Sequence, residues 1–191
     1  MGAEIPLPRR ALSVEDYHRM GEVGLFAPEE RLELIRGDLV TMAPIGGKHL
    51  HLVNVLAQLF SMQVGRSAVV SVQNPICIPP DSEPQPDVVL LRPECWGRAA
   101  VPTANDILLV IEVADTTLAR DREIKIPLYA RHGIPEAWVF DVAGERTTIY
   151  RDPGPAGYRT EMSPARDAAI SPRLRPDVAI SLAEVWLATA R

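Results

Sequence analysis

The chain has 191 residues, 47% of them hydrophobic and 24% charged, with a formal net charge of −5. This balance is typical of a soluble globular protein, and the acidic total argues against a dedicated nucleic-acid binder, which usually carries a basic excess. It does not exclude an enzyme acting on nucleic acid, because acids gathered to hold metal make the total more negative. The length predicts one domain over residues 1–191, with a core of about residues 12–150 and a C-terminal strand and helix in residues 151–191.

The two cysteines, Cys77 and Cys95, form no CxxC or Cys/His pattern. They are interpreted as reduced thiols of a cytoplasmic protein without a zinc site. The opening "MGAEIPLPRR" lacks the apolar stretch of a secretory signal. No apolar run reaches the roughly 18 residues of a membrane helix, so we expect no contact with a membrane.

The first predicted elements are a helix, a hairpin and a second helix. Ser13 followed by Asp16 is a capping-box-like start for a helix over residues 14–22. "ERLELIRGDLVTMAP" alternates apolar and polar residues on both sides of its Gly-Asp pair, which predicts a hairpin. "HLHLVNVLAQLFSMQVG" has apolar residues at helical spacing and predicts an amphipathic helix that Gly65 closes.

The middle of the chain changes to strand patterns. "AVVSVQNPICIPP" predicts two short strands around its Asn-Pro pair, and "PDVVLL" predicts another. "DILLVIEVAD" is the most apolar run and the best candidate for a central strand buried on both faces. "TTLARDREIKIPLYARHG" predicts a helix that ends at Gly133, although Pro127 removes a backbone donor and should kink or break it.

The last predicted elements are a hairpin, a strand and a short helix. "EAWVFDV" and "RTTIYR" flank the hairpin turn, and "PDVAISLAEVW" reads as a strand followed by a helix that Ser181 caps with Glu184. Helices that bracket a run of strands predict a mixed β-sheet with helices packed on its faces, an α/β or α+β fold.

Glu112 is the acid whose position most needs an explanation. It lies inside the apolar run "LLVIEVAD", where a buried carboxylate is strongly unfavourable unless it is paired or binds metal. Either the strand turns Glu112 to a solvated face, or Glu112 lies beside Asp87 on an adjacent strand and the two hold a divalent cation such as Mg²⁺. Asp87 by itself is equally well explained as a residue of the turn into its strand.

Asp121, Lys125 and Tyr129 are spaced to share one face of the following helix. The simpler interpretation is an Asp–Lys pair within the helix beside an amphipathic tyrosine. Because this helix follows the strand of Glu112, Lys125 is also a candidate to orient or deprotonate a water and to stabilise charge on a phosphate. We assign Tyr129 to substrate binding.

His49 opens the second predicted helix after two glycines. A positive helix N-terminus with flanking glycines is suited to contact a phosphate, whereas a lone histidine is more often structural. Glu33, in the first predicted strand, completes the set of candidate catalytic residues.

Three stretches together resemble the Uma family of restriction-endonuclease-like proteins, within the PD-(D/E)XK nuclease superfamily. They are "RLELIRGDLVTMAPIGGKH", "SEPQPDVVLL" and "LLVIEVADTTLARDREIKIPLYARHGIPEAWVFD". The resemblance implies a restriction-endonuclease-like mixed β-sheet flanked by helices, with a Mg²⁺- or Mn²⁺-dependent phosphodiesterase site acting on DNA.

The resemblance also implies roles for particular residues. The two superfamily acids correspond to Asp87 and Glu112, and the backbone carbonyl of Val113 becomes a further metal contact. Glu33 matches an acid that many of these nucleases carry on an N-terminal element. His49 matches a family histidine at the start of the second helix.

One position departs from the superfamily pattern, which places a lysine two residues after Glu112. This chain has Ala114 there, so Lys125 is the candidate replacement. Two functions are therefore expected: a metal-dependent endodeoxyribonuclease with Asp87, Glu112, Lys125 and Glu33 as catalytic residues, or a catalytically weak or inactive binding module of the same fold. We also expect a homodimer, because closed two-fold dimers are the commonest oligomers.

Overall fold

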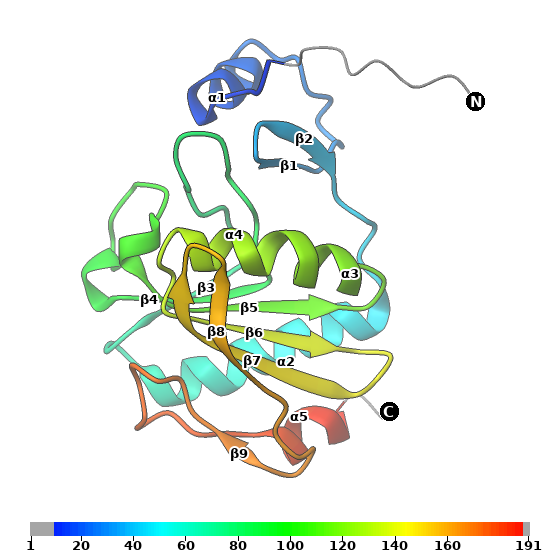
Figure 1. Ribbon diagram of the computed structural model, residues 1–191, viewed down its shortest axis with the longest axis vertical. Helices are drawn as coiled ribbons and strands as arrows, with labels where there is room; N and C mark the ends of the chain where they lie inside the picture. The colour runs from blue at the N-terminus through cyan, green and yellow to red at the C-terminus, as the bar shows by residue number, and fades with distance from the viewer. Residues whose placement is uncertain (1–9, 189–191) are drawn as a thin grey trace. The chain divides into compact units, whose positions relative to one another are not determined.

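The computed structural model describes residues 10–188 (Figure 1). The chain divides into two compact units. The first unit comprises the residues up to Met42 together with Cys77–Pro84, and the second unit comprises Ala43–Ile76 together with the residues from Gln85 onward.

The first unit contains a capped helix, α1 (Val14–Glu22). The Ser13 hydroxyl accepts a 3.0 Å hydrogen bond from the Asp16 amide, and the Asp16 carboxylate accepts one of 3.0 Å from the Ser13 amide. Each side chain thus satisfies a donor that the start of a helix leaves without a partner within the helix. The predicted helix and its capping box are confirmed.

The first unit also contains the predicted hairpin, formed by β1 (Leu32–Ile35) and β2 (Asp38–Thr41). Its two turn residues are Arg36 and Gly37, with φ of +53° and +80°, as a tight turn between right-twisted strands requires. The segment that returns to this unit pairs with the hairpin, since the Gly37 amide donates to the Asp81 carbonyl at 2.7 Å.

The second unit is built on a six-stranded sheet with the order β3-β4-β5-β6-β7-β8. Its strands are β3 (Val69–Val72), β4 (Val88–Leu91), β5 (Ile107–Ala114), β6 (Glu136–Asp141), β7 (Arg146–Gly154) and β8 (Gly157–Met162). Neighbouring strands are antiparallel except β5 and β6, which are parallel. A separate two-stranded sheet pairs β9 (Ala169–Ile170) with β10 (Ile180–Ser181).

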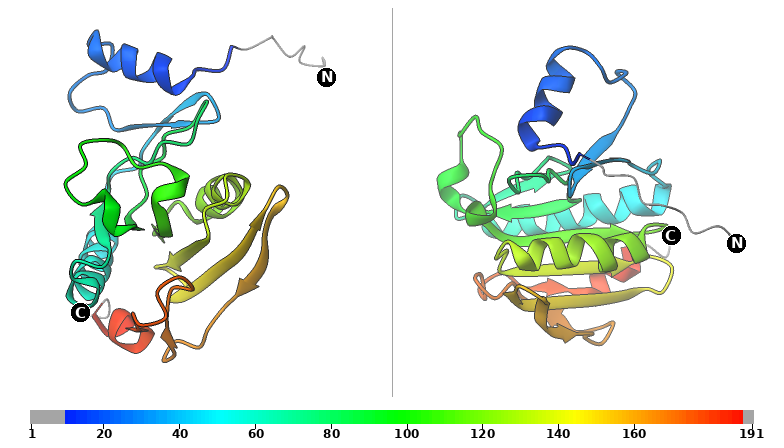
Figure 2. Two further views of the ribbon diagram at one scale, coloured as in Figure 1. Left: turned by 90° about the vertical axis from the view of Figure 1, so that its left-hand side faces the viewer. Right: turned by 45° about the horizontal axis from the view of Figure 1, so that its top comes forward.

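Helices cover both faces of the six-stranded sheet (Figures 1 and 2). Helices α2 (Gly47–Val64) and α5 (Leu182–Ala188) lie on one face. The other face carries one continuous helical segment, formed by α3 (Leu118–Arg120), a π-helical turn (Asp121–Lys125) and α4 (Ile126–Arg131). Short 3₁₀ turns occupy Pro93–Cys95 and Ala104–Asp106. This arrangement, with the N-terminal helix and hairpin, confirms the predicted fold class.

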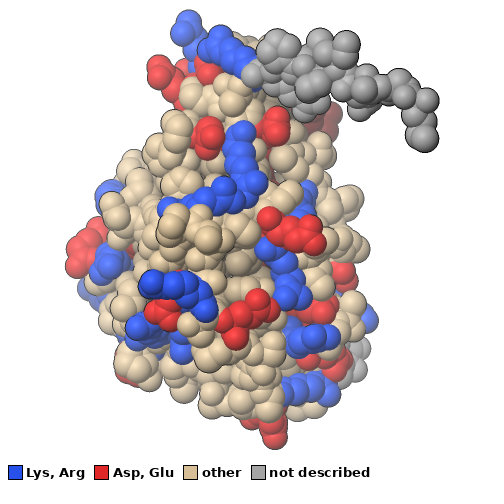
Figure 3. Space-filling model, in the orientation of Figure 1, with Lys and Arg blue, Asp and Glu red and all other residues tan. Residues whose placement is uncertain are grey.

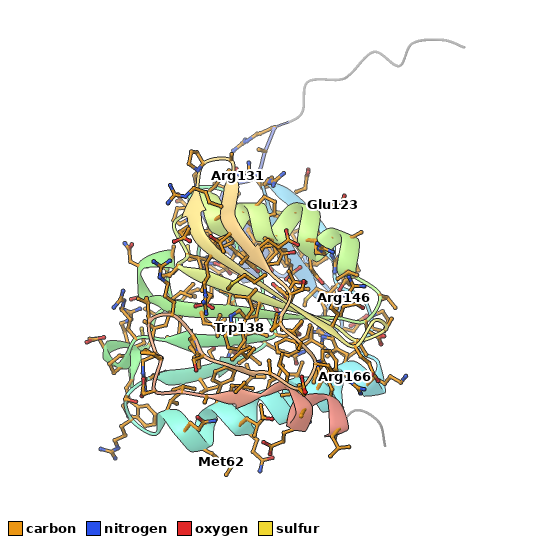
Figure 4. The ribbon with its side chains drawn as sticks, turned by 60° about the horizontal axis from the view of Figure 1, so that its bottom comes forward. Met62, Glu123, Arg131, Trp138, Arg146 and Arg166 are labelled. Carbon is orange, nitrogen blue, oxygen red and sulfur yellow. The ribbon has the colours of Figure 1, made fainter. Side chains whose placement is uncertain are left out.

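The main hydrophobic core lies between the sheet and α2 with α5. The ring of Trp138 on β6 packs 5.9 Å from that of Phe60 on α2, and the rings of Phe140 and Trp186 are 5.7 Å apart. Figure 4 shows Trp138 among these inward-facing side chains, while Met62, 75% exposed, points away from the sheet. Burial of these large side chains is the main stabilising contribution to the second unit.

Strand β5 is the central strand that its apolar sequence predicts. All eight of its residues are buried, and it pairs with β4 on one side and with β6 on the other. A strand with a sheet neighbour on both sides and helices on both faces reads as a continuous apolar run. Glu112 is therefore an ionisable residue inside the most enclosed strand of the sheet.

The predicted break at Pro127 takes the form of a π-helical turn just before it. The turn spans Asp121–Lys125, and Pro127 stands in the first turn of α4. Proline lacks the amide that a helix interior needs but is tolerated in a first turn. The helix therefore passes the proline without ending, and single π-turns of this kind are frequent at functional sites.

Some short strands were predicted wrongly or missed. The second half of "AVVSVQNPICIPP" forms only an isolated bridge between Ile78 and Ser82, because Pro79 and Pro80 cannot donate to a strand ladder. Strands β8 and β9 were not predicted. Both cysteines are free thiols. No helix within residues 10–188 is long and apolar enough to cross a membrane.

Candidate metal centre

Asp87 and Glu112 lie side by side on neighbouring strands of the second unit. Val88 pairs with Ile111 in the antiparallel ladder of β4 and β5, so one step further along the same register brings Asp87 opposite Glu112 on the same face. Asp87 is 8% exposed and Glu112 is 2% exposed. The alternative in which Glu112 turns to a solvated face is therefore wrong.

Both carboxylate oxygens of Asp87 accept hydrogen bonds within the second unit. Oδ2 accepts a 2.8 Å bond from the Val113 amide. Oδ1 lies 3.0 Å from Nε2 of His49 and 3.3 Å from the side-chain amide of Gln73. A carboxylate held by this many donors has a fixed orientation, as a binding site requires.

Gln73 is a contact that sequence reasoning missed. It follows β3 directly, and its φ of +51° lies in the left-handed region, which a non-glycine residue adopts at a cost. Its backbone amide donates to the Asp87 carbonyl at 3.0 Å and its side chain donates to the Asp87 carboxylate. Gln73 thus ties the end of β3 to the residue that precedes β4.

His49 reaches this site from the first turn of α2. Its hydrogen bond to Asp87 raises the pKa of the imidazole above its usual value, against the opposing effect of burial, and the charges of Asp115 and Asp121 add to the rise. The protonated form of His49 is therefore favoured beside Asp87. A Cβ added to Gly46, just before α2, would lie 2.9 Å from a carboxylate oxygen of Asp115, so the start of α2 closely approaches the end of β5.

Glu112 is held from the opposite direction, by the helical segment that covers its face of the sheet. The Tyr129 hydroxyl donates a 2.5 Å hydrogen bond to Oε1 of Glu112. The Lys125 ammonium lies 3.4 Å from the same oxygen. Lys125 is 4% exposed and Tyr129 is 0% exposed, so Tyr129, assigned to substrate binding from the sequence, presents no surface to a substrate.

Asp121 adds a third buried acid on the same helical segment. Its carboxylate accepts a 2.5 Å hydrogen bond from the Thr117 hydroxyl. Burial raises the pKa of Asp121, and the charge of Asp87 adds to this rise, while Lys125 and Thr117 oppose it. The outer side of the segment is exposed, as Figure 4 shows for Glu123 and Arg131. Some charged residues of the segment, such as Asp121, are therefore buried at the site, and others, such as Glu123, face solvent.

The donor chemistry of the site suits a hard divalent cation. Mg²⁺ is usually held by one or two carboxylates, with water and substrate phosphate completing its coordination, and Asp87 and Glu112 supply two. No group of three or more His, Cys, Asp and Glu side chains within residues 10–188 is arranged as a metal site. The site thus fits an ion bound through two carboxylates and not an all-protein cage.

Glu33 belongs to the first unit, where it lies on β1 with 0% exposure. Its catalytic role stays a prediction, as do the catalytic and metal-binding roles of Asp87, Glu112 and Lys125. Of the residues predicted for the site, the second unit brings together Asp87, Glu112, Val113, Lys125, Tyr129 and His49.

Comparisons with known proteins agree with this architecture. Residues 14–187 match the family model described as "Uma2: Putative restriction endonuclease". A solved structure from Anabaena variabilis ATCC 29413, described as a putative nuclease belonging to DUF820, superposes with a TM-score of 0.73 at 17% identity, over 93% of this chain and 99% of that one. At this identity the likeness shows the fold. No curated protein matches the chain.

Proposed function

The chain belongs to the Uma2 family, and from that premise we propose that it is a metal-dependent endonuclease that hydrolyses phosphodiester bonds in DNA. The observation that carries the proposal is the pair of buried carboxylates, Asp87 and Glu112, adjacent on β4 and β5. Two buried carboxylates next to each other repel, so a divalent cation between them would favour the ionised form of both.

Asp87 and Glu112 would hold Mg²⁺ or Mn²⁺. The Val113 amide points at Asp87, and in an antiparallel ladder the amide and the carbonyl of one residue point to the same neighbouring strand. This direction supports the Val113 carbonyl as a further contact to the ion. When bound, a divalent cation supplies Lewis-acid polarisation of a phosphodiester oxygen and lowers the pKa of water.

Lys125 would take the part of the lysine that Ala114 replaces. It is one of two lysines in the chain, and it is buried with its ammonium 3.4 Å from Glu112. An ammonium at that distance can orient a water held by the carboxylate and stabilise negative charge on a phosphate. His49, whose pKa is raised by its hydrogen bond to Asp87, would bind a phosphate oxygen of the substrate.

Metal binding and plasmid cleavage by the full chain test this function. We expect wild type to bind Mn²⁺ in calorimetry and to cleave circular DNA only when the ion is present. Asp87→Asn and Glu112→Gln should lose both properties, because each removes one negative ligand while keeping the side-chain shape. Glu123→Gln, an exposed position on the same helical segment, is the matched control and should behave as wild type. Equal Mn²⁺ binding by all four proteins would refute the proposal.

A second candidate function is a binding module with little or no catalysis. Side chains of the same chain already contact both acids, and this favours the module. Lys125 and Tyr129 contact Glu112, and His49 contacts Asp87. The same experiment separates the two functions. A wild-type protein that binds no Mn²⁺ and cleaves no DNA, yet shifts DNA in a gel, supports the module.

Charge on the surface sets the conditions for DNA binding. The face of the second unit in Figure 3 intersperses basic and acidic side chains, and the net charge is −5. We therefore infer that DNA binding relies on the metal and on few phosphate contacts, which predicts a shallow dependence of affinity on salt.

We also propose a homodimer, in which each of the two copies cleaves one strand of a duplex. Light scattering measures the mass of the protein in solution and so tests this homodimer directly.

A further inference from the structure

Tyr129 has a contact that neither a purely structural role nor a substrate contact explains well. It lies on α4 with 0% exposure, and its hydroxyl donates to Oε1 of Glu112 at 2.5 Å. A buried phenol needs a hydrogen-bond partner, but a backbone carbonyl would serve, as Ile134 does for Tyr158 at 2.8 Å. Here the partner is one of the two proposed metal ligands.

The same oxygen of Glu112 has a second contact, with a cationic side chain. The Lys125 ammonium lies 3.4 Å from Oε1, so the hydroxyl and the ammonium converge on one side of the carboxylate. A hydrogen bond and an ion pair at one oxygen leave a carboxylate few alternative rotamers. The other carboxylate of the pair is fixed in a comparable way, since Asp87 accepts from Val113 and from Gln73.

We propose that Tyr129 is a positioning residue for the metal ligand Glu112. Together with Lys125 it contacts Oε1, so that the carboxylate is held in one orientation beside Asp87. The inference rests on the proposed metal-dependent function. It changes the role of Tyr129 from contact with the substrate to orientation of a ligand, and such partners of metal ligands commonly tune metal affinity.

The position of residue 129 above β5 explains why a tyrosine hydroxyl can reach Glu112. The π-helical turn ends at Lys125 and α4 continues through Tyr129, so both side chains descend from the same helical segment onto β5. Phenylalanine would fill the same space on α4 but would remove the hydrogen bond from the hydroxyl to Oε1. The lost hydroxyl should therefore affect metal binding more than packing.

The test compares Tyr129→Phe with Tyr150→Phe. Tyr150 is also buried, at 6% exposure, and its hydroxyl bonds to Arg122 at 3.0 Å, so it offers the same chemical change at a different place. We expect calorimetry to show Mn²⁺ affinity reduced by about tenfold to a hundredfold in Tyr129→Phe and unchanged in Tyr150→Phe. At saturating Mn²⁺, Tyr129→Phe should recover most of the DNA cleavage rate.

A second readout needs neither metal nor DNA. Urea unfolding in EDTA of Tyr129→Phe, Glu112→Leu and the double variant forms a double-mutant cycle, because leucine at residue 112 has no oxygen to accept the hydrogen bond. If the hydroxyl bonds to the carboxylate, the double variant is less destabilised than the sum of the single variants. Additive losses would show that the two groups do not interact, and would overturn the inference.

The remaining outcomes are also decisive. Unchanged Mn²⁺ affinity in Tyr129→Phe overturns the positioning role and leaves the proposed function standing. A cleavage rate that stays low at saturating Mn²⁺, with normal affinity, means that the hydroxyl affects catalysis without changing metal binding, and this also overturns the positioning role. A wild-type protein that binds no Mn²⁺ removes the proposed function itself, and the positioning role falls with it.

Discussion

The ammonium of Lys125 lies 3.4 Å from Oε1 of Glu112, although Glu112 is on β5 and Lys125 is on the helical segment that follows it. The strand itself carries Ala114 at the position where the sequence resemblance implies a lysine. A helix that packs directly on the face of its preceding strand can therefore return a cation to a carboxylate on that strand. The distance gives a physical basis for expecting Lys125 to replace the missing lysine.

Lys125→Met should separate catalysis from metal binding. We expect DNA cleavage to fall at least about a hundredfold, since that is the usual contribution of a positioned acid or base. Mn²⁺ affinity should stay the same or increase, because a competing cation leaves Glu112. Unfolding free energy should fall by about 3 kcal/mol, as when one member of a buried ion pair is removed.

The control for this change is Lys48→Met, at the other lysine of the chain. Lys48 is exposed at the start of α2, and its replacement should change the unfolding free energy by less than about 0.5 kcal/mol. Cleavage assays, calorimetry and urea unfolding measure the three effects. Unaltered cleavage by Lys125→Met would exclude Lys125 from the reaction.

Asp121→Asn should stabilise the protein at neutral pH. Burial raises the pKa of Asp121 in the folded state, so its favourable contribution is complete below the unfolded pKa of about 3.9 and is lost as pH rises through the folded pKa. Above that range the ionised carboxylate costs stability. Urea unfolding from pH 4 to pH 8 should show the gain of Asp121→Asn growing with pH.

Asp152→Asn is the control of opposite sign. Hydrogen bonds from Arg173 and Thr160 lower the pKa of Asp152, so its contribution is present above the unfolded pKa and is lost as pH falls through the folded pKa. Its replacement should destabilise the protein at pH 7, and the effect should decrease as pH falls below 4. If stability changed with pH in the same direction in both variants, the causes given for the two opposite pKa shifts would be wrong.

Gly37→Ala should damage the first unit more than its turn conformation alone explains. The residue has φ of +80°, and a Cβ there would lie 2.5 Å from the Cβ and 2.9 Å from the Cα of Ala11. We expect a loss of about 3 kcal/mol, as left-handed strain of roughly 1–2 kcal/mol adds to overpacking of roughly 1–3 kcal/mol. Hydrogen exchange of the β1 and β2 amides and urea unfolding measure this loss.

Gly24→Ala isolates the conformational part of that effect. Gly24 has a similar φ of +73° with no heavy atom within 4 Å of an added Cβ. Its replacement should therefore cost only about 1–2 kcal/mol. Equal losses at Gly24 and Gly37 would show that the close approach of Ala11 is not important.

Ser13→Ala should destabilise the first turn of α1. The lost hydroxyl leaves the Asp16 amide without its cap, which typically costs about 1 kcal/mol, and amide exchange over Val14–Glu22 should accelerate accordingly. Ser181→Ala at α5 is a comparison, because its cap bond to Glu184 is longer, at 3.4 Å. Equal losses of stability in Ser13→Ala and Ser181→Ala would contradict the inference that the shorter cap bond is the stronger one.

The sequence predicted elements wherever a local signal and burial agreed. Ser13 with Asp16 marked α1, Gly65 marked the end of α2, and the run around Glu112 marked the central strand. It failed for β8, whose sequence "GYRTEM" has a polar, partly exposed pattern, because that edge strand forms through pairing with β7 and not through its own apolar pattern.

The site could be predicted only in part, because some of its contacts arise from tertiary packing. Glu112 stood out because a carboxylate in an apolar run demands an explanation, and Asp87 was found beside it. Gln73 gave no signal, since its role comes from the position at which β3 ends next to Asp87. Helical spacing placed Tyr129 near Lys125, but only packing against β5 reveals that its hydroxyl meets Glu112.

The chain contributes to the first unit twice, once before Met42 and again through Cys77–Pro84. On a ribosome, the hairpin around Gly37 therefore emerges well before the returning segment that supplies Asp81 as its hydrogen-bond partner. The N-terminal segment must wait, incompletely folded, while α2 and β3 of the other unit are synthesised. Once Pro84 is made, every residue of the first unit has been synthesised, whereas the second unit still awaits β4 to β8 and α5. The order of synthesis thus makes the discontinuous first unit the earlier of the two to be complete, although it is interrupted in the sequence.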